Sequence, residues 1–246
     1  MRQAPVRGIS GFLVSRFALG TLALWMFMFT IPILRAQNPE LQARLAELKE
    51  SMARNKQQLA HYSWTQQDII SLKGEEKNEE PFDVQLGPDG KPQKTNLDPN
   101  MSDDERHRRG LRGRIREKKI EEYKEYAEQM KSLMQQYVPP EKALLDQAYQ
   151  QGNVMFGPAG VPNEVRIVIT NYVKPQDSVT LVFNKQEKRL LSMNISSYLS
   201  DPSDAVKLSA QFSSLPDGTN HVSSMNLDGV SKQLTIAVTN TNYQKL

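Results

Sequence analysis

The sequence has 246 residues with 31 Lys and Arg, 28 Asp and Glu, three His and no Cys, which gives a formal charge of +3. The basic excess comes from the first 36 residues, which hold four Arg and no acid, so that 37–246 contains 27 basic against 28 acidic residues. The absence of Cys excludes disulfides, thiolate catalysis and Cys-based zinc sites. The overall charge therefore indicates no particular partner.

The N-terminal segment has the order of a targeting signal. A basic start is followed by the uncharged apolar run Phe17–Leu34 and then by Ala36, a small residue before a polar stretch. This order is typical of a cleaved secretory signal peptide in residues 1–36. The run is also long enough to span a bilayer, so a membrane anchor at 17–34 stays an alternative. In both cases we expect the body of the protein to be exported to the periplasm or cell envelope.

The exported part begins with a helix pattern. Asn38 followed by Pro39 is a favourable helix start, because Asn caps the first turn and Pro is tolerated at the first helical position. Apolar residues then recur at spacings of three and four, at Leu41, Leu45, Leu48, Met52 and Leu59. This stripe predicts a helix packed on a sheet, with a short coiled coil as the alternative.

The pattern then changes to that of β-structure. Residues 62–70 are rich in aromatic and β-branched types and predict a strand. Residues 82–86 alternate apolar with polar before the turn signal Gly87–Gly90, which predicts a hairpin returning over 93–97. The charged residues 73–81 are interpreted as a solvated loop rather than a cation site.

A helical insertion is predicted at about 103–151. Ser102–Glu105 has the spacing of a capping box, and a long helix is expected to run to about Tyr137. Pro139 and Pro140 end it, and a shorter helix follows over 141–151.

The remaining sequence predicts six strands separated by short polar turns. They are Val165–Val173, Val179–Asn184, Leu190–Tyr198, Val206–Phe212, His221–Leu227 and Gln233–Thr241. Without helices between them, such strands pair as an antiparallel meander. Their clear alternation predicts one apolar and one solvated face.

These elements predict an α+β fold for 37–246, built as a single half-barrel domain. The sheet of eight or nine antiparallel strands is expected to be strongly curved, because strand twist accumulates across a large sheet. Helices are expected to cover the concave apolar face of this partial barrel.

No catalytic motif is present in the sequence. The three histidines, His61, His107 and His221, do not have the spacing of a metal site or of a catalytic dyad. Serine-hydrolase signatures are also missing. We therefore predict a protein that is not an enzyme and uses no cofactor or metal.

A basic run lies at the start of the predicted insertion. Residues 106–119 contain eight Lys and Arg against one Glu. The arginines are Arg106, Arg108, Arg109, Arg112, Arg114 and Arg116. An exported protein does not ordinarily meet nucleic acid, so an anionic membrane surface or an acidic protein is the better candidate partner. Pairing with acids of the same helix at 121–125 is the alternative.

The order of elements resembles a known family. A leucine-striped helix precedes a Tyr-x-Trp strand at 62–64, and the 87–90 hairpin, a helical insertion and a six-stranded tract follow. This order over about 38–246 resembles the periplasmic outer-membrane lipoprotein carrier and sorting proteins of the LolA type. The chain is more similar still to an uncharacterised group of exported bacterial proteins, with which it shares the phrases at 171–177, 215–219 and 239–243.

The resemblance implies an unclosed barrel whose concave apolar face, covered by helices, holds acyl chains. No binding residue of the family matches a position here, and the long basic helix departs from the family pattern. Lipid or a lipidated protein is the implied partner.

The leading hypothesis is an exported, non-enzymatic binding protein that holds an apolar ligand against the sheet. The predicted lining residues are Val179, Leu181, Phe183, Leu191, Met193, Ile195, Leu208, Phe212, Leu234 and Ile236. The same residues also fit a filled core. A second hypothesis is a cell-envelope interaction module that docks an acidic partner or membrane surface through the basic run.

Overall fold

The computed structural model describes residues 39–97 and 111–246, and in the helix that begins at Leu111 it describes side chains from Lys118 onward. Three helices lie in this part, α1 (Pro39–Leu59), α2 (Leu111–Met134) and α3 (Lys142–Gln150). The strands are β1 (Tyr62–Leu72), β2 (Glu75–Leu86), β3 (Pro92–Asn96), β4 (Val154–Pro158), β5 (Glu164–Thr170), β6 (Ser178–Asn184), β7 (Arg189–Tyr198), β8 (Ala205–Ser214), β9 (Asn220–Gly229) and β10 (Leu234–Lys245).

All ten strands form one antiparallel sheet in the order β3-β2-β1-β10-β9-β8-β7-β6-β5-β4. The first and last strands of the meander meet in its interior, where β1 pairs with β10 over most of its length and Ile70 lies opposite Ile236. β3 and β4 are the two edges and do not pair with each other, so the sheet is open. The predicted α+β half-barrel is confirmed, with ten strands where eight or nine were expected.

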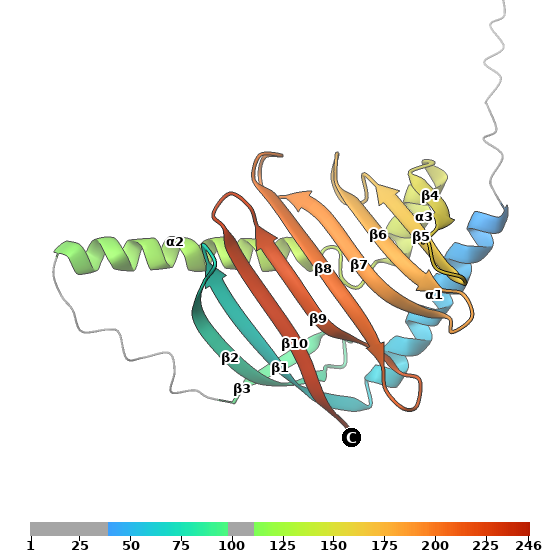
Figure 1. The fold of residues 1–246 in the computed structure, drawn as a ribbon, viewed down its shortest axis with the longest axis horizontal. Helices are drawn as coiled ribbons and strands as arrows, with labels where there is room; N and C mark the ends of the chain where they lie inside the picture. Colours follow the sequence, from blue (N-terminus) through green and yellow to red (C-terminus); the bar gives the residue numbers. More distant parts are fainter. Residues whose placement is uncertain (1–38, 98–110) are drawn as a thin grey trace, which may run out of the picture. The chain divides into compact units, whose positions relative to one another are not determined.

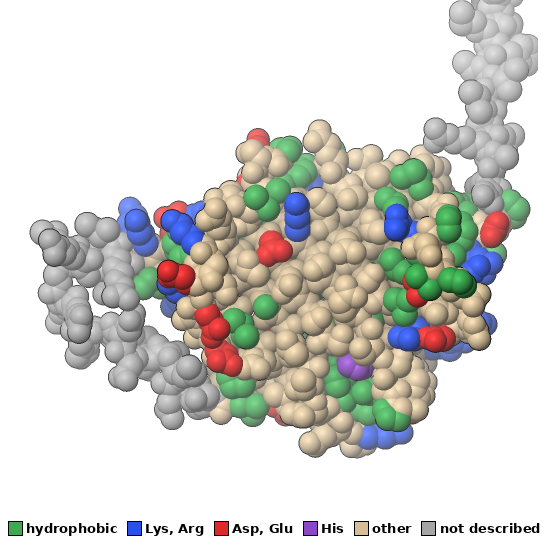
Figure 2. Space-filling view, in the orientation of Figure 1, with side chains coloured by type: hydrophobic (Ala, Val, Ile, Leu, Met, Phe, Trp, Pro, Cys, Tyr) green, Lys and Arg blue, Asp and Glu red, His purple; other side chains and the backbone are tan. Residues whose placement is uncertain are grey.

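The helices cover one face of the sheet, and Figure 1 shows α2 crossing behind β8, β9 and β10. Apolar side chains from all three helices join those of the sheet in one core. Figure 2 shows the opposite face, whose centre consists mainly of uncharged polar side chains and backbone. This difference between the faces follows from the alternation of side chains along each strand.

The prediction of a charged loop at 73–81 is wrong, because β2 begins at Glu75. Lys73 and Gly74 both have positive φ angles, 54° and 79°, which suits a tight two-residue hairpin turn. β1 is eleven residues long, and its backbone pairs with that of β2 as far as Leu72, which lies opposite Glu75. Strand pairing therefore overrides the local preference of a charged sequence for a loop.

The strand β4 was not predicted; it is a five-residue edge strand in which Val154 lies opposite Ile169. Its Gly157 and Pro158 weaken the strand pattern, but an edge strand tolerates proline. β5 ends at Thr170, three residues before the predicted end. The next residue, Asn171, has a φ of 51° and starts a tight turn.

Predicted helices over 39–59 and 141–151 are confirmed by α1 and α3. The long helix is confirmed from Leu111 to Met134, three residues short of its predicted end. The predicted capping box at 102–105 and the predicted leader at 1–36 lie outside the described residues.

Candidate functional site

The helix-covered face of the sheet carries most of the predicted lining residues as fully buried side chains. Eight of the ten expose 3% or less of their surface, namely Val179, Leu181, Phe183, Met193, Ile195, Leu208, Leu234 and Ile236. Phe212 is half-buried and packs against the same core. The structure therefore brings these side chains, from β6, β7, β8 and β10, together on one surface.

Leu191 is the exception, because the strand register shifts beside it. The β6–β7 ladder has an irregularity between Val182 and Phe183, so that Phe183 pairs with Leu190. Leu190 is buried in the core, whereas Leu191 is half-buried. A bulge moves the residues on one side of it to the opposite face, which places Leu190 where Leu191 was predicted.

Helix side chains fill the space over the centre of this face. Leu48 of α1, Met130 of α2 and Leu145 of α3 expose 1% or less and belong to the same cluster as the strand residues. Gly229 of β9 permits the close approach of α2, since a Cβ there would lie 2.5 Å from Tyr126 and 2.6 Å from Met130. This part of the face is a packed core.

The apolar surface continues beyond the packed centre. Among the half-buried apolar side chains that contact the core, those of α1, β1, β8 and β9 are Met52, Ile70, Leu72, Phe212, Val222 and Met225. We call these six side chains the apolar margin.

Next to the apolar margin the covered face becomes polar. Gln66 and Asp68 of β1 occupy the same side as Ile70, and both are more than nine-tenths buried. Gln66 Nε2 donates to Asp68 Oδ1 at 2.5 Å, and Lys94 Nζ of β3 donates to Asp68 Oδ2 at 3.0 Å. Lys94 also lies 5.0 Å from the centre of the Phe82 ring. The buried carboxylate is thus paired and hydrogen-bonded, as burial of a charge requires.

An aromatic pair adjoins this polar group. Trp64 of β1 stacks on Tyr243 of β10 with ring centroids 5.5 Å apart and an interplanar angle of 18°. Asn240 of β10 lies directly opposite Gln66 in the ladder. We call Trp64, Gln66, Asp68, Lys94 and Asn240 the polar patch.

Two tyrosines attach α2 and the segment after it to the strand ends. Tyr126 donates to Asp204 at 2.8 Å and lies 3.0 Å from Ser231. Tyr137 is fully buried and donates to Asp177 Oδ2 at 2.7 Å. Burial raises the pKa of the Tyr137 hydroxyl above its ordinary value, so it stays a donor at physiological pH. The helix is therefore fixed over the sheet by directed bonds as well as by packing.

Asp177 organises the turn to which Tyr137 binds. Its carboxylate accepts the backbone N–H groups of Tyr172, Val173 and Lys174 at 2.5, 2.9 and 2.9 Å. This explains the phrase at 171–177, whose final Asp closes the turn.

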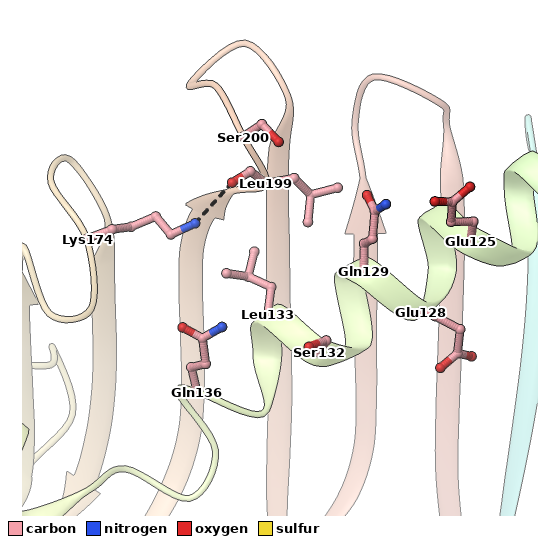
Figure 3. A pocket seen from close by; sticks show the side chains of 9 residues that line it. All are labelled: Glu125, Glu128, Gln129, Ser132, Leu133, Gln136, Lys174, Leu199 and Ser200. Carbon is pink, nitrogen blue, oxygen red and sulfur yellow. Dashed lines mark hydrogen bonds between the residues drawn. The ribbon is translucent and has the colours of Figure 1, made fainter.

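A shallow groove of about 520 Å³ lies between α2 and these turns (Figure 3). Its lining residues are Glu125, Glu128, Gln129, Ser132, Leu133, Gln136, Lys174, Leu199 and Ser200. Lys174 Nζ donates to the carbonyl oxygens of Tyr198 and Leu199 at 2.8 and 3.1 Å. Because its one cation serves the turn and seven of its nine lining residues are polar, the groove is interpreted as a seam between the helix and the strand ends.

The opposite end of the strands holds α1. Asn55 Nδ2 donates to the carbonyl oxygen of Asn220, and the backbone N–H of Asn220 donates to Asn55 Oδ1 at 2.6 Å. Tyr62 donates to Asp217 Oδ2 at 2.6 Å, and this bond, with that from the Thr219 N–H, lowers the pKa of Asp217 to about 2. These contacts fix the β8–β9 turn, which carries the phrase at 215–219.

Other predicted chemistry is only partly within the described residues. Arg106, Arg108 and Arg109 lie outside them, and Arg112, Arg114 and Arg116 belong to α2 at positions whose side chains are not described. Docking through this basic surface stays a prediction. In the described ranges, no group of three His, Asp or Glu side chains could hold a metal ion. No helix within 39–97 or 111–246 is long and apolar enough to cross a membrane.

Comparison with solved structures finds two chains of similar fold. One is a DUF1329 family protein from Desulfovibrio piger, 12% identical, with a TM-score of 0.42 over 81% of this chain and 92% of that chain. The other is a LolA superfamily protein from Nitrosomonas europaea, 8% identical, with a TM-score of 0.37 over 81% of this chain and 93% of that chain. The second of these proteins belongs to the superfamily that the order of elements in this sequence resembles.

No family model matches the sequence, and neither does any curated protein. The two likenesses have TM-scores below 0.5, so no ligand, activity or partner is carried over from them.

The polar patch was missed in the sequence, although a signal for it exists. Alternation in β1 puts Gln66 and Asp68 on the same side as Trp64 and Ile70. Two polar residues in an inward row of a strand are unusual, because burial of such groups is costly without partners. Lys94, their partner, is distant in sequence and could not be paired with them from spacing alone.

Proposed function

We propose that this chain is an exported, non-enzymatic binding protein that holds an apolar ligand, such as acyl chains, at the covered face of its sheet. The observation that carries the proposal is the apolar margin, six half-buried side chains of α1, β1, β8 and β9 that contact the core. The sequence supports export through its leader.

The apolar margin is suited to contact a flexible apolar ligand. Each apolar side chain left partly in water costs about 25 cal/mol for every Å² that remains exposed, and a ligand that covers it recovers that free energy. Met52 and Met225 contribute unbranched, polarisable side chains that adapt to ligands of different shape. Phe212 adds an aromatic ring to the same margin.

The packed centre limits how the ligand is held. Since side chains of all three helices pack with the strand residues in one core, a ligand of several carbons lies at the apolar margin or displaces helix residues. The alternative, in which the whole surface is only a core, predicts no ligand binding.

Native mass spectrometry of the exported full chain, purified without detergent, tests the proposal, together with titration of the apolar fluorophore 1-N-phenylnaphthylamine. We expect co-purified lipid or saturable probe binding that palmitate displaces. Met225→Gln should weaken probe binding about tenfold, because a polar group then enters the apolar margin.

Met155→Gln is the matched control, since Met155 lies on the edge strand β4 and is 59% exposed. It should bind the probe like the wild type. If the wild type neither co-purifies with lipid nor binds the probe, the proposal is refuted.

A further inference from the structure

Two polar atoms of the polar patch are buried and lack a hydrogen-bond partner among the described residues. They are the indole nitrogen Nε1 of Trp64, a donor, and the side-chain oxygen Oδ1 of Asn240, an acceptor. Trp64 exposes only 6% of its surface. Leaving such an atom unpaired costs on the order of 1–3 kcal/mol, so each one calls for a ligand or an ordered water.

Both groups are held in fixed orientations. The Trp64 ring is fixed by its stacking on Tyr243. Asn240 Nδ2 donates to the carbonyl oxygen of Val222 at 2.9 Å, which orients the amide and leaves Oδ1 as the free atom. Tyr243 donates to the same carbonyl at 3.3 Å. The free donor and the free acceptor are therefore preorganised, which lowers the entropy cost of binding.

The two groups both adjoin Tyr243. The Tyr243 ring stacks on Trp64 with centroids 5.5 Å apart, and the Tyr243 hydroxyl and the Asn240 amide both donate to the Val222 carbonyl oxygen. The β1–β10 register shifts between Ser63 and Thr65, so Trp64 does not take part in the regular pairing. The free donor and the free acceptor thus belong to two side chains that lie against the same tyrosine.

The charges of the polar patch cancel within the protein. Asp68 is paired with Lys94 at 3.0 Å, so the patch offers no unpaired charge to an ionic head group. Asn240 donates to the backbone of Val222, which belongs to the apolar margin. A neutral polar site thus adjoins an apolar surface, which matches a molecule with a polar head and an apolar tail.

We propose that Trp64 and Asn240 form a head-group subsite for an acyl ligand whose neutral head carries an acceptor and a donor side by side, as an amide does. The ligand carbonyl accepts the indole N–H, and the ligand N–H donates to Asn240 Oδ1. This inference rests on the proposed function, because the acyl chain is held by the apolar margin.

Competition for bound 1-N-phenylnaphthylamine tests the subsite with two ligands of equal chain length, palmitoyl amide and methyl palmitate. The ester accepts a hydrogen bond but cannot donate one. The wild type should bind the amide about tenfold more tightly than the ester. Asn240→Ala should abolish that preference, and Trp64→Phe, which keeps the stacked ring, should weaken both ligands by a similar factor. The fluorophore itself should bind all of these proteins equally.

Asn194→Ala is the matched control, because Asn194 is exposed on β7 and opposes Ser209 of β8. It should keep the full preference for the amide. Equal affinity of the wild type for amide and ester means that the two atoms hold only water, and it overturns the subsite while fluorophore binding still supports the proposed function. If the wild type does not bind the fluorophore, both the subsite and the proposed function are refuted.

Discussion

The two halves of the covered face have the same strand architecture but different surfaces. Over β5–β8 the inward rows are aliphatic and aromatic, and helix side chains pack on them. Over β1 and the outer part of β10 the inward positions hold Trp64, Gln66, Asp68 and Asn240. Because backbone pairing extends across both halves, the side chains decide that one half is an apolar core and the other is polar.

The largest expected effect lies in the aliphatic half. Leu181→Ala removes a fully buried side chain from the middle of β6, and we expect unfolding free energy to fall by roughly 2–5 kcal/mol because a cavity remains. Urea denaturation measures the loss. A loss below about 1 kcal/mol would contradict the assignment of this half as packed core, since a collapsible or already hollow site gives small losses.

A second comparison tests the bulge within the same half. Leu190→Ala should destabilise the protein by about 2 kcal/mol more than Leu191→Ala, because Leu190 faces the core and Leu191 does not belong to it. The two variants are matched in chemistry and adjacent in sequence. Equal losses, measured by the same denaturation, would mean that the register shift between Val182 and Phe183 is absent in solution.

The aliphatic half could largely be predicted from sequence, whereas the polar half could not. Regular alternation in the strands from β5 to β10 identifies most of their inward residues, and the register shift beside Leu190 removes one predicted lining residue, Leu191, from the core. A bulge depends on how two strands pair, so it cannot be recognised reliably from the sequence of one strand.

The secondary structure of the β1–β3 region could not be predicted from local sequence for another reason. β2 carries charges that favour a loop, and it becomes a strand only because β1 is long enough to pair with it. The ion pair between Asp68 and Lys94 joins β1 to β3 across β2, so spacing gives no hint of it.

The polar half should be more tolerant of substitution than the aliphatic half. Asp68→Asn keeps the shape and an oxygen that accepts from Gln66, and Lys94 is 37% exposed and can be hydrated when the charge is lost. We expect a loss of about 1 kcal/mol by urea denaturation. A loss as large as that of Leu181→Ala would make the ion pair a structural element and remove the contrast between the halves.

The smallest expected effect is a pH dependence at the end of β1, where Tyr62 donates to Asp217. This bond lowers the pKa of Asp217 to about 2, so at mildly acidic pH the unfolded chain binds the proton that the folded chain does not. The stability that Asp217 contributes is therefore complete above its unfolded-state pKa of about 4 and is lost as the pH falls through about 2.

Denaturation midpoints measured from pH 5 downward should decrease less steeply in Asp217→Asn than in the wild type. Tyr62→Phe, which removes the donor and keeps the ring, should reproduce part of that change. If Asp217→Asn retains the full acid slope of the wild type, the carboxylate does not hold the β8–β9 turn to β1, and the polar half is less firmly anchored than its contacts indicate.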